Sequence, residues 1–530
     1  MGMERWRKLL TENRNEIAMW VVALALAAFM LTPLLSSGFF SDDGVNSLVV
    51  PSAVAAQHSS LLREVANAYG GAVRAVGRFF PFATYAVFLF WFVNGNLALY
   101  KWLILLLVMA DLALFGRLVR ALTASPVMGV LAIMLPPLLF QFRFYSDPIL
   151  AFGALPQVIT LLTFGSLLAW VAFLRDGKKR HLVVSLVLYG VSLLTYEIVL
   201  PFFLLHLLIA WWYPQRTPLR DAARASWPFA VLAVCSAVVV VGVRLSNSIA
   251  LAGGASGGNY TPNTDPFAAL FAMARQVSAA LPLSYHILLG STNGIDGIRP
   301  FEGLFSYIGR YPASSMVVLA GVTAFVAAGV WMLRGTAPAA APKKRSPGPA
   351  APRSISIPGL LWTGAALLVL PATLVALSPK YQSEILWGKG YIPVYVSYFG
   401  TALLIIAGLG AAARIGSAKN ALRIALAVGL AMALGALGVM TYQDNRIIVE
   451  RFDRDWLYPR QVEQDALARG LVSPVPADSR IVMLVKRGWD EPAFFAVHAG
   501  KLERTADARE AATWTAMLTG RTPQLSLIHI

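Results

Sequence analysis

Long apolar runs separated by short polar segments dominate the sequence. A helix needs about 20 mostly apolar residues to cross a bilayer, and runs close to that length recur along most of the chain. They lie near residues 17–35, 97–116, 126–141, 156–174, 182–196, 198–213, 227–246, 314–333, 358–378, 391–413 and 421–441. This pattern predicts an all-α polytopic membrane protein with about 11 transmembrane helices.

The composition agrees with this class and excludes several others. Of the 530 residues, 57% are hydrophobic and only 13% are charged, whereas roughly 25% are charged in soluble domains. The single cysteine, Cys235, excludes a disulfide framework and a cysteine-based metal site. The first apolar run is too long for a signal-peptide core, and no A-x-A-like cleavage site follows it, so we expect an uncleaved first helix.

The chain has 44 basic and 27 acidic residues, a net charge of +17, and 21 of the basic residues fall on one side of the predicted membrane, which indicates that they mainly set the orientation. If the N-terminus is cytoplasmic, the cytoplasmic segments are rich in Lys and Arg, as the positive-inside rule requires. They contain Arg5, Arg7, Lys8, Arg14, Arg117, Arg120, Arg175, Lys178, Lys179, Arg180, Arg216, Arg220, Arg224, Arg334, Lys343, Lys344, Arg345, Arg353, Arg414, Lys419 and Arg423. We expect a multi-pass protein of the bacterial inner (plasma) membrane with a cytoplasmic N-terminus, a periplasmic C-terminus and no nucleic-acid partner.

The sequence predicts a transmembrane module over residues 1–441 and a separate C-terminal segment. Within the module, residues 36–96 are predicted to form a long first periplasmic loop. Its segment 51–71 is mildly amphipathic and suits a helix on the membrane surface between Pro51 and Gly70–Gly71. The Ala/Pro-rich residues 335–357 are typical of a cytoplasmic linker. Residues 442–530 predict a small periplasmic α/β segment, with a strand over 479–487 and a helix over 506–518.

Acidic residues near span ends are the first candidates for chemistry, because carboxylates are costly at membrane depth. Asp42 and Asp43 directly follow the first span, and Glu197 lies in a tight turn between two spans. The structural alternatives are that Ser41 or Asp42 caps the next helix and that Glu197 forms a structural ion pair with a loop arginine.

Cations and aromatic residues recur on the same outer side. Such cations oppose the orientation signal, although long side chains can also extend to lipid headgroups. Tyrosines accompany them, and Tyr391, Tyr395 and Tyr398 are spaced to share one helix face on which a sugar ring could stack; an interfacial aromatic belt is the alternative. The candidates for binding a donor phosphate or sugar are Arg78, Arg143, Glu197, Lys380, Lys389, Tyr196, Tyr381 and Tyr391.

This combination of residues suits the transfer of a glycosyl group from a lipid phosphate. An acceptor hydroxyl that attacks the anomeric carbon needs a general base within hydrogen-bond reach. The leaving phosphate needs Arg or Lys in a poorly hydrated site. One base without a second nucleophile favours a single, inverting displacement.

The sequence resembles the GT-C superfamily of multispanning glycosyltransferases, which share an acidic pair just after the first span. The words "GRFF", "TYE", "PKYQ" and "GYIPVY" are similar to those of bacterial O-antigen glucosyltransferases involved in serotype conversion, and the resemblance covers residues 1–441. It implies that Asp42, or else Asp43, is the general base, and that the donor carries undecaprenyl or decaprenyl phosphate. It also allows a divalent cation (Mg²⁺, Mn²⁺ or Ca²⁺) beside Asp42 and Asp43.

Three other functions stay open at the level of sequence. A transporter or flippase of lipid-linked sugars would place carboxylates near mid-membrane and contain broken helices. A metal-dependent lipid-modifying transferase would need a histidine set, but His58, His206 and His286 are scattered. A non-catalytic assembly subunit is the third. For the transferase, the expected partners are the polyprenyl-phosphate sugar, a cell-envelope glycan or lipid acceptor, and membrane lipids.

Overall fold

The chain is a multi-pass helical membrane protein. The computed structural model describes residues 14–41, 43, 46–47, 50, 60–144, 147–213, 217–250, 265–289, 303–335, 354–414, 420–452, 469, 480–483, 493–498 and 501–505. Within these residues, six helices are long and apolar enough to cross a membrane. The prediction of a polytopic helical membrane protein is confirmed at this level.

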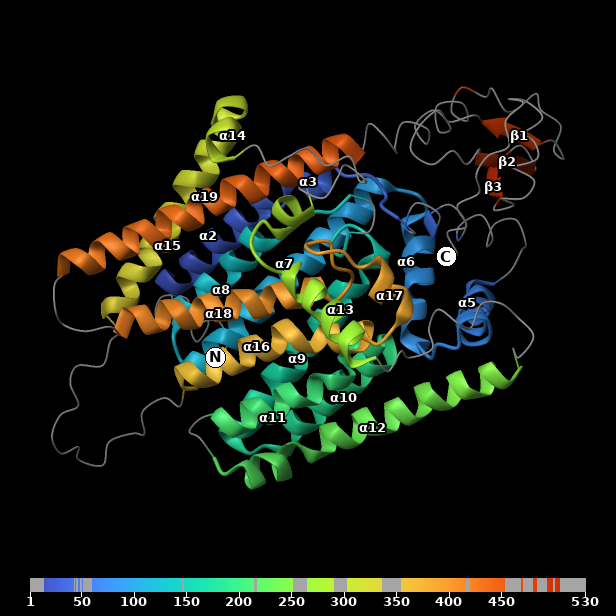
Figure 1. Cartoon of the computed structure of the whole chain (residues 1–530), viewed down its shortest axis with the longest axis horizontal. Helices are drawn as coiled ribbons and strands as arrows, with labels where there is room; N and C mark the ends of the chain where they lie inside the picture. Colours follow the sequence, from blue (N-terminus) through green and yellow to red (C-terminus); the bar gives the residue numbers. More distant parts are fainter. Residues whose placement is uncertain are drawn as a thin grey trace, which may run out of the picture.

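Each of the predicted apolar runs falls on a helix (Figure 1). These helices are α2 (Arg14–Met30), α7 (Leu97–Thr123), α8 (Pro126–Leu139), α9 (Leu155–Asp176), α10 (Lys179–Thr195), α11 (Phe203–Trp212), α12 (Leu219–Ala250), α15 (Pro312–Gly335), α16 (Ile357–Ala376), α18 (Val394–Arg414) and α19 (Asn420–Phe452). Close neighbours include the pairs α7–α8, α9–α10, α11–α12, α15–α19 and α16–α18. In Figure 1, the axes of α12, α16, α18 and α19 are roughly parallel, and the chain runs through α18 in the opposite direction to α16 and α19.

Shorter elements occupy the connections. They are α3 (Thr32–Leu35), α5 (Leu61–Val76), η1 (Pro81–Thr84), α6 (Tyr85–Val93), η2 (Phe152–Ala154), η3 (Glu197–Phe202), α13 (Pro266–Ser278), the π-helix η5 (Tyr285–Leu289), α14 (Leu304–Arg310) and α17 (Pro379–Glu384). Near the C-terminus, β1 (Arg480–Met483), β2 (Ala493–His498) and β3 (Lys501–Thr505) form an antiparallel sheet in the order β1-β2-β3. Ile481 pairs with Phe495, which pairs with Arg504.

The α7–α8 hairpin illustrates how local sequence sets the helix ends. The Asn96 side chain caps α7 by accepting from the Leu99 N–H at 3.0 Å. After α7 ends, Ser125 caps α8 in the same way, and Pro126 occupies its first turn, where a missing N–H costs nothing. Small residues then let the two helices approach, because a Cβ on Gly116 would lie 2.8 Å from the Gly129 carbonyl oxygen.

The two ends of the helix bundle differ in charge. Glu16 at the start of α2 forms an ion pair with Arg120 near the end of α7, and the Ile355 N–H before α16 donates to the Leu122 carbonyl at 2.7 Å. The end of α9, the start of α10, the end of α11 and the start of α12 also lie at this basic end, because the helices alternate in direction along the chain. The opposite end, here named the Asp43 end, contains Asp43, the start of α7 and the end of α10.

The contact between α16 and α18 provides a test of helix packing. A Cβ on Gly400 of α18 would lie 2.7 Å from Leu368 Cα and 2.8 Å from the Gly364 carbonyl oxygen in α16, whereas a Cβ on Gly408 would meet nothing within 4 Å. We expect Gly400→Ala to lower the free energy of unfolding by about 1–3 kcal/mol, because the backbones must move apart. Gly408→Ala, in the same helix, should be neutral. Thermal unfolding in detergent would compare them, and equal stability of the two variants would contradict the close approach.

Several local expectations differ from the structure. The amphipathic helix α5 does not stop at Gly70–Gly71; it continues to Val76 and ends at Gly77, whose φ of 64° suits glycine. Residues 51–59 lie outside the described residues. Helix α6 was not anticipated, because its 9 residues are apolar but too short to span. Tyr391 precedes α18, so it does not share a helix face with Tyr395 and Tyr398, and both of these are buried.

The expected segment boundaries can also be compared with the elements. Helix α19 runs past residue 441 to Phe452, and Tyr442 within it stacks on Phe29 of α2 with ring centroids 5.6 Å apart. Strand β1 lies within the strand predicted over 479–487. The helix predicted over 506–518 and most of the linker predicted over 335–357 lie outside the described residues.

Candidate functional site at the Asp43 end of the bundle

Asp43 is buried, with an exposed fraction of 0%. Its Oδ2 accepts a hydrogen bond from the Tyr100 hydroxyl in the first turn of α7, and its Oδ1 accepts from the Gly153 N–H at 2.8 Å. These charge-assisted bonds stabilise the carboxylate and fix its orientation. Asp42, the other member of the predicted acidic pair, lies outside the described residues.

The Gly153 N–H, which donates a hydrogen bond to Asp43, belongs to an unusual turn. Phe152, Gly153 and Ala154 all have positive φ values, of 66°, 56° and 60°, a conformation that costs energy in residues other than glycine. The Tyr85 hydroxyl of α6 donates to the Gly153 carbonyl at 2.8 Å, opposite the N–H that binds Asp43. The turn is therefore held from both sides, which is typical of strained backbone at a functional site.

Lys101 lies beside this acid and was missed by the sequence analysis. It is fully buried near the start of α7, with Nζ 3.4 Å from the Leu150 carbonyl oxygen. Its ammonium group also lies 5.5 Å and 5.4 Å from the ring centroids of Phe40 and Tyr100, within the range of cation–π attraction. The available signal was a lysine inside an apolar run, which marks functional sites in membranes.

A second charged group combines two arginines and one glutamate. Glu197 Oε1 lies 3.1 Å from Arg78 Nη2, and its Oε2 lies 3.0 Å from Arg244 Nη2. The side chains of Arg78, Glu197 and Arg244 are 18%, 15% and 29% exposed, so the group remains partly open to solvent. Arg244 was not predicted because it lies inside the run 227–246, although an arginine at the outer end of a span opposes the positive-inside rule.

Aromatic rings surround Arg78. Its guanidinium carbon lies 4.5 Å from the Phe80 ring centroid and 5.3 Å from that of Tyr196. The Tyr381 hydroxyl also lies close enough to interact with the Arg78 charge. Burial raises the pKa of Tyr381, as does the neighbouring Tyr391. Tyr381 therefore stays neutral at physiological pH and can donate a hydrogen bond.

Tyr391 connects this group with the turn at Gly153. The rings of Tyr381 and Tyr391 have centroids 4.8 Å apart, and the Tyr391 ring meets Phe152 edge-on at 5.2 Å. Phe152 directly precedes Gly153, whose N–H binds Asp43. Contacts through Tyr381, Tyr391 and Phe152 therefore connect the surroundings of Arg78 with the turn that binds Asp43.

The structure consequently brings together most of the side chains predicted as a donor site. Five of them form one group: Arg78, Tyr196, Glu197, Tyr381 and Tyr391. Lys380 lies at its edge, with Nζ 5.9 Å from the Tyr381 ring centroid. Lys389 lies elsewhere along the same loop, where its carbonyl oxygen accepts a hydrogen bond from Arg143.

Arg143 has a different environment from the other predicted cations. It is 1% exposed, and its guanidinium donates to the backbone carbonyls of Gln141 at 2.8 Å, Ala279 at 2.9 Å and Lys389. Irregular backbone at membrane depth requires such internal partners. Arg143 therefore holds three irregular segments together.

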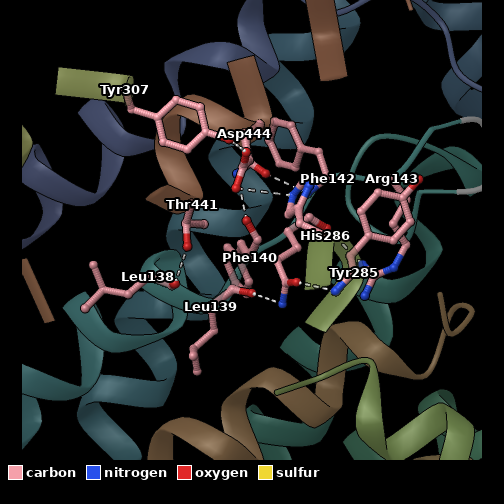
Figure 2. Close-up of polar contacts among 12 residues, drawn as sticks. Leu138, Leu139, Phe140, Phe142, Arg143, Tyr285, His286, Tyr307, Thr441 and Asp444 are labelled. Carbon is pink, nitrogen blue, oxygen red and sulfur yellow. Dashed lines mark hydrogen bonds and ion pairs between the residues drawn. The ribbon is translucent and has the colours of Figure 1, made fainter. Parts of the chain in front are cut away.

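The segment that follows α8 is also held by α19 (Figure 2). Asn445 donates to the Phe140 carbonyl and accepts from the Phe142 N–H, both at 2.7 Å. Thr441 donates to the Leu138 carbonyl at 2.8 Å. Because the carbonyls near a helix C-terminus lack intrahelical partners, these side chains replace the missing helical hydrogen bonds.

Figure 2 also shows a buried polar group between α14, η5 and α19. The Tyr307 hydroxyl donates to Asp444 Oδ1, and His286 Nε2 lies 3.7 Å from Asp444 Oδ2. Burial lowers the pKa of His286 to about 3, and the nearby Arg143 charge contributes in the same direction. His286 is therefore neutral at physiological pH. The sequence analysis assigned no role to Asp444.

Asp147 organises the loop between α8 and η2 and provides a pH-dependent test. It accepts backbone N–H bonds from Arg143, Ile149 and Leu150. Burial nevertheless raises its pKa to about 6, with Arg143 opposing this effect.

Because an Asp in an unfolded chain titrates near pH ~3.9, the folded protein holds a proton between about pH 4 and 6 that the unfolded chain has released. Asp147 therefore makes stability fall as the pH rises through this interval. Asp147→Asn should flatten that slope in thermal unfolding measured against pH. An identical slope in wild type and variant would mean that burial does not shift Asp147.

Two further observations concern the alternatives to a transferase. Among the described residues, no three His, Cys, Asp or Glu side chains gather in a way that could hold a metal ion. Both Asp43 oxygens accept hydrogen bonds, so these residues do not assemble a cation site around Asp43.

Asp111, buried within α7, accepts a hydrogen bond from Tyr395 at 2.9 Å. Its Oδ1 has no hydrogen-bond partner among the described residues.

Comparison with known proteins does not assign the chain to a family. A scan against models of protein families finds no match, and no curated protein matches the sequence.

Proposed function

We propose that this protein is a membrane glycosyltransferase that moves a sugar from a polyprenyl-phosphate donor to a cell-envelope glycan or lipid acceptor. The proposal rests chiefly on the group formed by Arg78, Glu197 and Arg244, which is partly open to solvent. Cations in a poorly hydrated site suit a lipid phosphate, and contacts through Tyr391 and Phe152 connect this group with Asp43.

The chemistry that we propose assigns different roles to the two acids. Asp43 already accepts from Tyr100 and Gly153, which suits a positioning residue. Asp42 is the general base that takes the proton of the acceptor hydroxyl. The acceptor oxygen then bonds to the anomeric carbon while the bond from that carbon to the phosphate oxygen breaks. The lipid phosphate leaves with the electron pair, the two arginines stabilise its charge, and this single displacement inverts the anomeric centre.

The distribution of charge supports a periplasmic location for this reaction. Lys and Arg concentrate at the opposite, basic end of the bundle, and cytoplasmic ends are the basic ones in bacterial membrane proteins. At the Asp43 end, α6 exposes Phe88, Trp91 and Phe92, and its Phe90 side chain approaches Gly153. These apolar side chains offer a surface for a polyprenyl tail beside the proposed site.

A reconstituted system tests the proposal directly. The full chain in lipid vesicles would be supplied with a labelled polyprenyl-phosphate sugar and with cell-envelope glycans or lipids as acceptors. We expect the label to appear in the acceptor with an inverted anomeric configuration, with release of polyprenyl phosphate. Recovery of intact donor after incubation with each acceptor class would contradict the transferase. Adding EDTA in the same assay measures whether a divalent cation takes part.

Asp111 favours a transporter or flippase as the second candidate function, because a buried carboxylate within a span suits ion coupling. Asp111→Asn retains an oxygen that can accept from Tyr395 while removing the ionisable group. If the protein is a transferase, this variant should transfer sugar at a rate near wild type. If it is a transporter, the variant should stop movement of intact lipid-linked sugar between leaflets, measured by its accessibility to an added sugar-oxidising reagent.

A further inference from the structure

The group formed by Arg78, Glu197 and Arg244 has an unusual balance of charge for an anion site. Two guanidinium groups and one carboxylate carry a net charge of +1, with Glu197 bonded to both arginines. Arg244 donates only through Nη2 among the described residues, and its Nε is a buried atom without a hydrogen-bond partner there. Arg244 therefore keeps donors for a ligand while Glu197 remains bound.

The backbone around Glu197 limits its freedom to move away. Tyr196 ends α10 in an extended conformation, with φ −160° and ψ 136°, and Glu197 begins the 3-10 helix η3 immediately afterwards. This helix contacts α12, which carries Arg244, as well as α16 and α11. Hydrogen bonds from Arg78 and Arg244 hold the carboxylate itself, so it remains part of the electrostatic environment when a ligand arrives.

From this geometry we propose that Glu197 determines specificity, by making the site select a singly charged lipid phosphodiester over a doubly charged lipid diphosphate. A ligand of charge −1 neutralises these three side chains, with Lys380 outside them at the edge of the group, whereas the additional charge of a diphosphate is repelled by Glu197. Such repulsive elements commonly set specificity. The natural ligand depends on the proposed function, but the selection between these two kinds of lipid anion is a binding property that can be measured without any transfer reaction.

Two synthetic probes isolate the effect of charge. Farnesyl methyl phosphate carries one negative charge, and farnesyl methyl diphosphate carries two. Binding of each probe to the full chain in nanodiscs would be measured by calorimetry. We expect wild type to prefer the monophosphate, and Glu197→Gln to shift the affinity ratio toward the diphosphate by about tenfold, as expected for removing one nearby charge in a partly hydrated site.

A double-mutant cycle separates charge from other effects of substitution. Arg244→Gln reduces the net charge to zero and should weaken both probes, the diphosphate more strongly. The double variant Glu197→Gln/Arg244→Gln returns the net charge to +1 and should return the preference toward that of wild type. If Glu197→Gln does not fold because Arg78 and Arg244 then repel each other, the double variant removes that repulsion, and its comparison with Arg244→Gln still measures the effect of Glu197.

The matched control is Glu450→Gln, because Glu450 forms an exposed pair with Arg446 on α19. It removes the same charge outside the proposed site and should leave the affinity ratio unchanged. An unchanged ratio in Glu197→Gln, or a double variant that behaves like Arg244→Gln, would overturn the inference. Wild type that selects the monophosphate but transfers no sugar would instead refute the proposed function alone.

Discussion

Asp42→Asn is expected to reduce sugar transfer by about 10²–10⁴-fold, because it removes the proposed general base. The substitution preserves size and polarity, so the yield and thermal stability of the protein should remain near those of wild type. The measurement is the initial rate of label transfer from a polyprenyl-phosphate sugar in vesicles. A variant with full activity would remove Asp42 from this role.

Asp43→Asn is the informative comparison for that experiment. Its amide oxygen can still accept from the Gly153 N–H while its NH₂ group donates to the Tyr100 hydroxyl, but both bonds lose the charge of the carboxylate, which makes them weaker. We therefore expect Asp43→Asn to lower both thermal stability and transfer, whereas Asp42→Asn lowers transfer alone. If Asp43→Asn lost only transfer and Asp42→Asn lost nothing, the assignments of the two acids would have to be exchanged.

Arg143→Met should cause the largest loss of stability, about 3–5 kcal/mol in the free energy of unfolding. The substitution leaves the backbone carbonyls of Gln141, Ala279 and Lys389 without their donor, and each buried polar group left unsatisfied costs about 1–3 kcal/mol. Denaturant or thermal unfolding in detergent would measure the loss.

Arg446→Met is the control for Arg143→Met. Arg446 forms an exposed pair with Glu450, and pairs of this kind contribute only about 0–1 kcal/mol. If Arg143→Met unfolded like wild type but bound a lipid phosphate poorly, the phosphate-binding role predicted for Arg143 from the sequence would be favoured over the structural one.

Hydropathy was sufficient to find the long apolar helices, because burial in lipid demands long uninterrupted apolar segments, and six helices in the described part of the chain are long and apolar enough to cross a membrane. It could not find α6, whose 9 apolar residues are fewer than a span requires. It also assigned residues 391–413 to one helix, although α18 begins at Val394 and Tyr391 belongs to the preceding loop. The start of α18 depends on tertiary contacts that hydropathy does not contain. One of them is the hydrogen bond from the Gln276 side chain to the Tyr391 carbonyl, just before the helix begins.

The candidate site was only partly predictable for a related reason. Arg78 and Glu197 were recognised because a charge at the outer end of a span is unusual, and the same rule would have identified Arg244 had the run 227–246 been inspected for charge. The environment of Arg143 could not be derived, because its partners Ala279 and Lys389 are distant in sequence. A sequence indicates that a cation lies outside the membrane, but not which oxygen atoms it faces.

The hydrogen bonds from α19 to the segment after α8 determine where the protein can be shortened. A version shortened at residue 441 would lose Asn445, and with it the hydrogen bonds to the backbone of Phe140 and Phe142. It would also lose Phe452, whose ring stacks on Phe40 just ahead of the acidic pair, with centroids 3.6 Å apart. Loss of activity on such a deletion would report collapse of the membrane part, so the cut that tests the remaining C-terminal residues belongs after Phe452.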